Sequence, residues 1–343
     1  MERWPPKGMP RPAPTIGASV DVTGLLDVRL VLVTGKGGVG KSAVAGALAL
    51  AASRTGRRTC LVEVEGRQTF ARLFDTQPWD FEEREFRPGI HGLSIDPEAS
   101  LAEYLEMFYG ARRISKLVVG STAVEFATTA APGLKDVLLI GKVKEMERRR
   151  DEDGRFHYDL VVVDAPPTGR IVNFLRAPEA TTELVNVGPI RSQAQSLVDL
   201  LLDERRTCAL LVTLLEELPV SETVEGARAL RELGVAVGPV VANRVLPERF
   251  DEAQRKALSE QLDADRLTAV LAEADLEVSG TTAEALLERG RAELDRLALQ
   301  ETMRDQLEQE LPLSCFELPE LYADEFAAAE LARLADRFEE AWR

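Results

Sequence analysis

Short apolar runs recur along the chain, and segments with helical patterning separate them. The first run, residues 29–34, is continuous and carries β-branched residues, as expected for a strand buried on both faces of a parallel sheet. Similar runs follow at residues 58–63, 92–96, 158–164, 207–214 and 235–243. This alternation predicts an α/β fold with a doubly wound, mostly parallel sheet.

Two of the helical segments are longer than a simple crossover between strands requires. We expect helical insertions at about residues 97–150 and 178–204, which together would form a helical subdomain. After residue 243, two acidic helix-favouring runs precede a short extended element at 311–319 and a final helix. Residues 1–27 are rich in proline and read as a flexible tail, so residues 28–343 form the single expected domain.

A glycine-rich loop lies between the first strand and an alanine-rich helix at residues 43–54. Glycines allow successive backbone N–H groups to point at an anion next to a helix N-terminus. Lys41 would reach the β- and γ-phosphates, and the Ser42 hydroxyl would bind Mg²⁺. The loop therefore predicts a bound nucleoside triphosphate and Mg²⁺. The predicted nucleotide-binding residues of the loop are Gly35, Lys36, Gly37, Gly38, Val39, Gly40, Lys41 and Ser42.

The apolar run 158–164 ends in a carboxylate, Asp164. Nucleotide-binding sheets place at such a position the aspartate that holds the magnesium shell, so we expect Asp164 to contact Mg²⁺ through water. The turn that follows, Ala-Pro-Pro-Thr-Gly-Arg170, could sense the γ-phosphate through its backbone N–H groups. An ordinary proline turn after a strand is the alternative.

With these motifs the chain resembles the deviant phosphate-loop NTPases, and among them the arsenical pump-driving and guided-entry ATPases, the latter being targeting factors for tail-anchored proteins. The resemblance covers about residues 28–343 and looks closest to actinobacterial guided-entry-like "anion-transporter" ATPases. It is carried by residues 164–178, 61–67, 125–129 and 131–133, and by Glu222 and Thr223.

The resemblance implies a role for several residues. Lys36 matches a signature lysine that reaches across a dimer to the partner's nucleotide. Together with Lys41 and Asp164, it would act in catalysis. Asn243 matches a residue that reads adenine, and residues 313–319, which end at Pro319, match a loop that lines the base. Glu65 stands where the family has a water-orienting aspartate; an exposed strand-end carboxylate is the alternative, and Glu63 is a nearby substitute.

The family resemblance further implies a homodimer, or a heterodimer with a paralogue, that binds a hydrophobic protein client or a membrane partner. Residues 101–109, 118–131 and 137–140 are apolar enough to line a client groove, or are ordinary packing faces. The chain has few methionines in its helical insertions. It also has no cysteine pair, so no zinc site is expected.

Charge and hydropathy narrow the remaining classes. A net charge of −16 argues against a nucleic-acid partner. The last 23 residues carry six acidic and three basic side chains, which disfavours the partitioning or division-site ATPases that bind anionic lipid through a basic helix. No apolar stretch is long enough to span a bilayer, so we expect a soluble, cytoplasmic protein. The family resemblance implies that it is an ATP hydrolase, with ATP and Mg²⁺ as cofactors. A non-hydrolysing ATP-binding scaffold is the other alternative.

Overall fold

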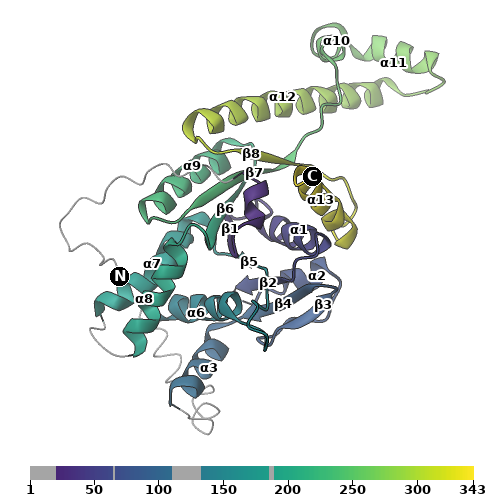
Figure 1. Cartoon of the computed structure of the whole chain (residues 1–343). Helices are drawn as coiled ribbons and strands as arrows, with labels where there is room; N and C mark the ends of the chain where they lie inside the picture. The colour runs from purple at the N-terminus through teal and green to yellow at the C-terminus, as the bar shows by residue number, and fades with distance from the viewer. Residues whose placement is uncertain (1–20, 65, 110–132, 185–188) are drawn as a thin grey trace.

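The computed structural model describes residues 21–64, 66–109, 133–184 and 189–343. A sheet of eight strands in the order β3-β4-β2-β5-β1-β6-β7-β8 runs through the molecule, with helices on both faces (Figure 1). The pairs are parallel except for β3 and β4, so the predicted doubly wound, mostly parallel sheet is confirmed. The strands are β1 (Leu30–Gly35), β2 (Thr59–Val64), β3 (Arg84–Arg87), β4 (Ile90–Ile95), β5 (Leu160–Asp164), β6 (Thr207–Thr213), β7 (Val237–Val245) and β8 (Cys315–Pro319).

The central strands are buried along their whole length, as their continuous apolar sequences predict. Every residue of β1, β2, β5 and β6 is buried, because helices cover both faces of the sheet. The edge strand β3 was not predicted. Its sequence, Arg-Glu-Phe-Arg, alternates between half-buried and exposed positions. A charged edge strand of this kind discourages pairing with another chain.

Two helical layers enclose two apolar cores. On one face of the sheet lie α1 (Lys41–Arg54), α2 (Thr69–Leu73) and α13 (Ala328–Ala341). On the other face lie α6 (Leu134–Arg148), α7 (Thr168–Leu184), α8 (Pro189–Leu202) and α9 (Glu217–Glu232). Helix α3 (Pro97–Tyr109) packs against α6. The first core holds Phe70 and Phe338, and the second holds Tyr158 and Phe174.

The helical insertions differ in detail from the expected boundaries. In the first insertion the structure describes α3 and α6, whereas residues 110–132 lie outside the described part. The second was expected to begin at residue 178, but α7 already begins at Thr168 and has Pro178 inside it. Proline lacks the N–H that would bond the preceding turn, which is why the sequence pattern suggested a helix start there.

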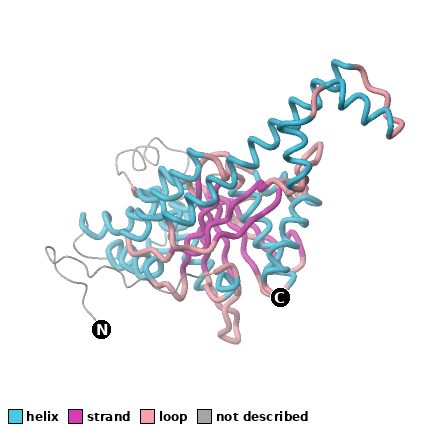
Figure 2. The backbone as a smooth tube through the Cα atoms, turned by 90° about the horizontal axis from the view of Figure 1, so that it is seen from above, coloured by secondary structure: helices cyan, strands magenta, loops and turns pink. Residues whose placement is uncertain are grey.

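A projecting arm is the other unpredicted feature of the fold. It consists of residues 252–296, which form α10 (Glu252–Lys256), the π-helical turn Ala257–Gln261, α11 (Ala264–Glu273) and the first half of α12 (Gly280–Glu310). Figures 1 and 2 show that it extends away from the sheet. Helix α11 was not predicted and has no buried residue. The second half of α12 packs onto the body through Met303 and Leu307. Within the described ranges, no helix combines the length and apolar character that a membrane crossing needs.

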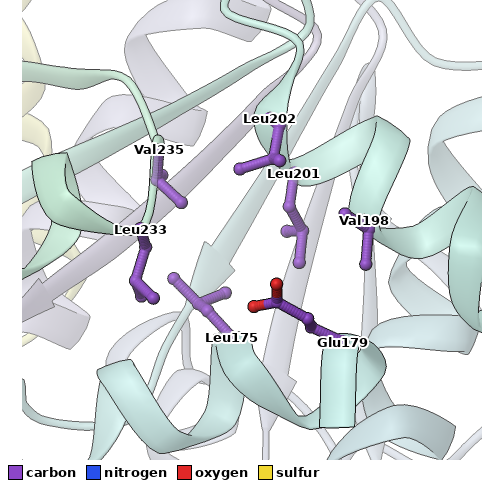
Figure 3. A pocket seen from close by; sticks show the side chains of 7 residues that line it. All are labelled: Leu175, Glu179, Val198, Leu201, Leu202, Leu233 and Val235. Atoms are coloured by element: carbon purple, nitrogen blue, oxygen red, sulfur yellow. The ribbon is translucent and has the colours of Figure 1, made fainter. Parts of the chain in front are cut away.

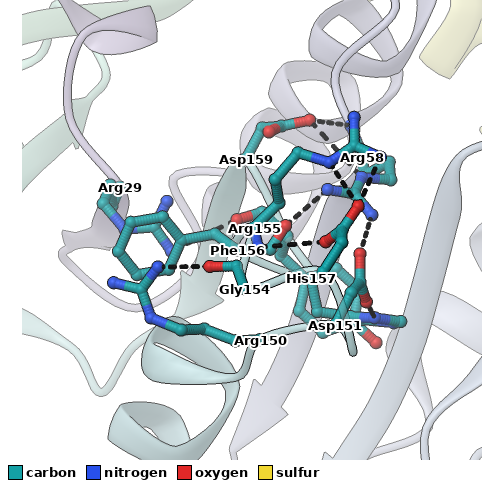
Figure 4. A network of polar contacts seen from close by, with 11 residues as sticks. Arg29, Arg58, Arg150, Asp151, Gly154, Arg155, Phe156, His157 and Asp159 are labelled. Carbon is teal, nitrogen blue, oxygen red and sulfur yellow. Dashed lines mark hydrogen bonds and ion pairs between the residues drawn. The ribbon is translucent and has the colours of Figure 1, made fainter.

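A polar network holds the loop before β5 against neighbouring strands (Figure 4). The ring of Phe156 lies between two guanidinium groups, with Arg29 Cζ 3.3 Å and Arg150 Cζ 3.8 Å from its centroid. Asp151 accepts a hydrogen bond from Arg58 Nη1 at 2.6 Å, and its other oxygen contacts His157 Nδ1. These contacts guide β5 between β1 and β2, so the far end of β5 emerges beside the glycine-rich loop.

Candidate functional site

The glycine-rich loop connects β1 to α1 at the carboxyl edge of the sheet, and its glycines fall into two groups. A Cβ on Gly35 would lie 2.1 Å from the Val212 carbonyl oxygen, and one on Gly40 would lie 2.3 Å from Asn243 Nδ2. A Cβ on Gly37 or Gly38 would meet no described protein atom within 4 Å. The first two glycines are therefore required by the fold, and the other two border open space where phosphates are expected.

Lys41 lies at the start of α1 and points back into the loop. Its side chain is mostly buried, and its Nζ donates a hydrogen bond to the Lys36 carbonyl oxygen at 3.0 Å. Burial lowers the pKa of Lys41, while the nearby Asp164 carboxylate partly offsets this shift. The amine is thus held inside the loop, next to the position predicted for phosphate.

Ser42 and Asp164, which were each predicted to serve Mg²⁺, lie next to each other. The Ser42 hydroxyl donates to Asp164 Oδ2 at 2.6 Å, while Asp164 Oδ1 is buried and accepts no hydrogen bond from the described residues. Burial raises the pKa of Asp164, and the Ser42 hydrogen bond and the Lys41 charge oppose that rise. The Ser42 hydroxyl and the Asp164 carboxylate thus lie side by side, and Asp164 Oδ1 still has room for a partner. Oxygen ligands placed in this way fit a Mg²⁺ ion and its bound water molecules.

Glu65, the predicted water-orienting residue, lies outside the described residues. Glu63, the substitute, is 1% exposed and lies opposite Asp164 in the sheet register. Its two carboxylate oxygens accept hydrogen bonds from the backbone N–H groups of Gln68 at 2.7 Å and Thr69 at 2.6 Å. Glu63 therefore anchors the start of α2. This role was not predicted, because it depends on the path of the chain after the strand.

The two residues predicted near the base lie on neighbouring strands. Asn243 is 5% exposed in β7 and donates from Nδ2 to the Val39 carbonyl oxygen at 2.9 Å, so it contacts the glycine-rich loop directly. Pro319 ends β8 and pairs with Val245, where β7 ends. The strand extends two residues past the predicted end at Asn243. Contact of either residue with adenine stays a prediction.

Lys36 contacts a different part of the molecule from Lys41. Its Nζ lies 3.3 Å from Oε1 of Glu222 on α9, and the two side chains are 25% and 35% exposed. Sequence spacing could not predict this pair, because the two residues belong to different elements far apart in the chain. Arg170, after the proline turn, lies 3.5 Å from the Asp136 carboxylate.

A cavity away from the loop is too small for a ligand. It lies between α7, α8 and the connection from α9 to β7, and its volume of about 20 Å³ has room for about one water molecule (Figure 3). Leu175, Glu179, Val198, Leu201, Leu202, Leu233 and Val235 line it. Of the expected client-binding stretches, 118–131 lies outside the described residues. Leu139 and Ile140, from the stretch 137–140, pack in the core.

Comparison with known proteins gives consistent matches. A family model described as anion-transporting ATPase matches residues 28–199 and 186–273. ATPase BagA of Mycobacterium tuberculosis is 42% identical over 301 residues, which are 86% of this chain and 88% of that protein. An arsenical pump-driving ATPase of Acidiphilium multivorum is 26% identical over 253 residues, 66% of this chain and 40% of that protein. The model's first match includes the glycine-rich loop and Asp164.

Proposed function

We propose that this chain, which belongs to the anion-transporting ATPase family and is an ATP hydrolase, works as a Mg-ATP-dependent dimeric switch. In this proposal the nucleotide controls how two copies, or this chain and a paralogue, sit together. The pair in turn binds or releases a hydrophobic protein client or a membrane-associated partner.

The observation that carries the proposal is the different surroundings of the two lysines in the loop. Lys41 is 8% exposed and bonds the loop's own backbone, so it is placed to serve the nucleotide of its own chain. Lys36 is 25% exposed, and its amine contacts Glu222 on α9 instead of the loop. A partly exposed cation beside a phosphate site is suited to the nucleotide of a second chain, as an arginine finger is.

The described side chains support hydrolysis in a definite way. Loop N–H groups and Lys41 would bind the phosphates, and Ser42 and Asp164 would hold the metal. Bound Mg²⁺ would neutralise charge on the β- and γ-phosphates. Two roles go beyond the contacts of the described side chains: Glu65, which lies outside the described residues, would orient the attacking water, and Lys36 of the second chain would stabilise the transferring phosphoryl group.

The test is Lys36→Ala, with Lys256→Ala on the exposed face of the arm as the matched control. Sedimentation and steady-state phosphate release are measured over a range of protein concentrations. We expect Lys36→Ala to lower turnover by about 10³-fold or more, the size attributed to a cation supplied in trans, and to weaken ATP-dependent association. Normal turnover and association in Lys36→Ala would overturn the dimeric switch.

The client is tested separately with Glu65→Gln, which should hold ATP without turning it over. The variant is incubated with Mg-ATP and a peptide that ends in an apolar helix of about 20 residues, the length that spans a bilayer. Binding that is lost on exchange to Mg-ADP supports the client role. A scrambled peptide of equal charge that binds as well would contradict it.

A further inference from the structure

We propose that Glu222 is a positioning residue for Lys36: it holds the lysine within its own chain until a second chain presents a nucleotide. The inference rests on the proposed dimeric switch and adds a competition to it. Lys36 can pair with Glu222 or reach into a second chain's triphosphate, and each pairing excludes the other. Glu222 would thereby set the protein concentration at which ATP brings two chains together.

The geometry of the pair favours such an exchange. Lys36 Nζ and Glu222 Oε1 are 3.3 Å apart, close enough for an ion pair, and both side chains keep about a quarter to a third of their surface exposed. A partly exposed pair contributes little to the stability of the fold, so it can be broken at low cost. A triphosphate, with its higher charge, is a stronger partner for the amine.

The surface around the pair is open to a second chain. Leu218 lies one turn before Glu222 on α9, and it is 58% exposed, the largest exposed fraction among the large apolar side chains that the structure describes as exposed. An apolar side chain beside a partly exposed ion pair is a composition suited to an interface with another copy. The face of α9 that carries Glu222 is therefore the face on which the second chain is expected.

The same helix touches the segment that follows Asp164. Gly226 lies one turn after Glu222, and a Cβ there would be 3.0 Å from Thr168 Cγ2 at the start of α7. The Thr168 hydroxyl is buried and has no hydrogen bond to the described residues. Helix α9 therefore contacts both Lys36, through Glu222, and the segment that follows Asp164, which places the proposed pairing of chains next to the metal site.

The test compares Glu222→Gln with Glu232→Gln, an exposed glutamate at the far end of the same helix. With Mg-ATP, we expect Glu222→Gln to associate at a protein concentration two- to fivefold lower than wild type, the effect of losing a partly exposed ion pair. Turnover at saturating protein should stay unchanged, while half-maximal turnover moves to the lower protein concentration. Glu232→Gln should behave as wild type. Unchanged or weaker association of Glu222→Gln would overturn the proposal.

The double variant Lys36→Ala/Glu222→Gln separates this inference from the proposed function. If Glu222 acts through Lys36, removing the carboxylate should have no effect on association once the lysine is gone. An equal effect of Glu222→Gln with and without Lys36 would overturn the positioning role and leave the dimeric switch intact. If Lys36→Ala alone changes nothing, the dimeric switch itself fails.

Discussion

Substitution of Gly40 by alanine tests the geometry of the loop most directly. Gly40 has φ +93°, a left-handed conformation, and a Cβ there would lie 2.3 Å from Asn243 Nδ2. That nitrogen donates the hydrogen bond to the Val39 carbonyl oxygen at 2.9 Å. Alanine at position 40 therefore strains the backbone and displaces a buried amide at the same time.

The expected cost follows from these two effects. A left-handed conformation costs a residue with a Cβ about 1–2 kcal/mol relative to glycine. Displacing Asn243, which is 5% exposed, leaves a buried polar group without its partner and costs about 1–3 kcal/mol more. We therefore expect Gly40→Ala to lower the free energy of unfolding by about 2–5 kcal/mol, a large part of the stability of a typical domain.

Gly37→Ala is the matched control within the same loop, because a Cβ there meets no described protein atom within 4 Å. Urea unfolding without nucleotide should show Gly37→Ala within about 1 kcal/mol of wild type, since no packing is disturbed. Titration with a fluorescent ATP analogue should show weakened binding for Gly37→Ala, because the added methyl group occupies the space of the phosphates. The two variants thus separate a glycine needed for folding from one needed for the ligand.

Either of two results would refute this reasoning. Wild-type stability of Gly40→Ala would mean that Asn243 does not pack against the loop as described. A destabilised Gly37→Ala that still binds the analogue normally would mean that Gly37 faces protein rather than phosphate.

Two further substitutions test the carboxylates behind the loop. Because the pKa of Asp164 is raised in the fold, its ionised form is destabilising above that pKa. Asp164→Asn should therefore increase the free energy of unfolding at neutral pH and lose this gain as the pH falls through the folded-state pKa, which thermal unfolding over a pH series would show. The same variant should reduce Mg-dependent turnover by at least about a hundredfold in a phosphate-release assay. Glu63→Gln should lower the free energy of unfolding in urea by about 2–3 kcal/mol. Each carboxylate oxygen of Glu63 accepts a hydrogen bond from one backbone N–H, and in glutamine an NH₂ group, which cannot accept, replaces one of these oxygens. Glu82→Gln, at an exposed site, should leave the free energy of unfolding almost unchanged.

The fold could be predicted where burial leaves a mark on the sequence. The first four residues of β1, Leu30 to Val33, are apolar because helices cover both faces of the strand, and that run identified it. The strand β3 and helix α11 have no such mark. The strand is charged and lies at the sheet edge, and the helix buries no residue. The strand takes its place from its neighbour β4. The helix has apolar residues at helical spacing, Leu267 and Leu271, but they are only half-buried and form no continuous apolar run.

The site divides in the same way. Ser42 and Asp164 could be placed together in advance, because each belongs to a motif whose position on a strand and a helix is fixed by the phosphate chemistry. The ion pair of Lys36 with Glu222 and the anchoring of α2 by Glu63 depend on distances between elements. Such contacts follow from the packed structure, and no local sequence pattern predicts them.

The length of the projecting arm would enlarge small movements that begin near the nucleotide site. Helix α9 packs beside the second half of α12, where Arg228 Nη2 lies 3.0 Å from Glu310 Oε2, and α12 is 31 residues long. From Leu297 to Gly280 it reaches about 26 Å at 1.5 Å per residue, so a tilt of about ten degrees at Leu297 swings the tip by roughly 4–5 Å. A displacement too small to notice beside the phosphates would thus become, at the far end of the arm, a movement as wide as a side chain.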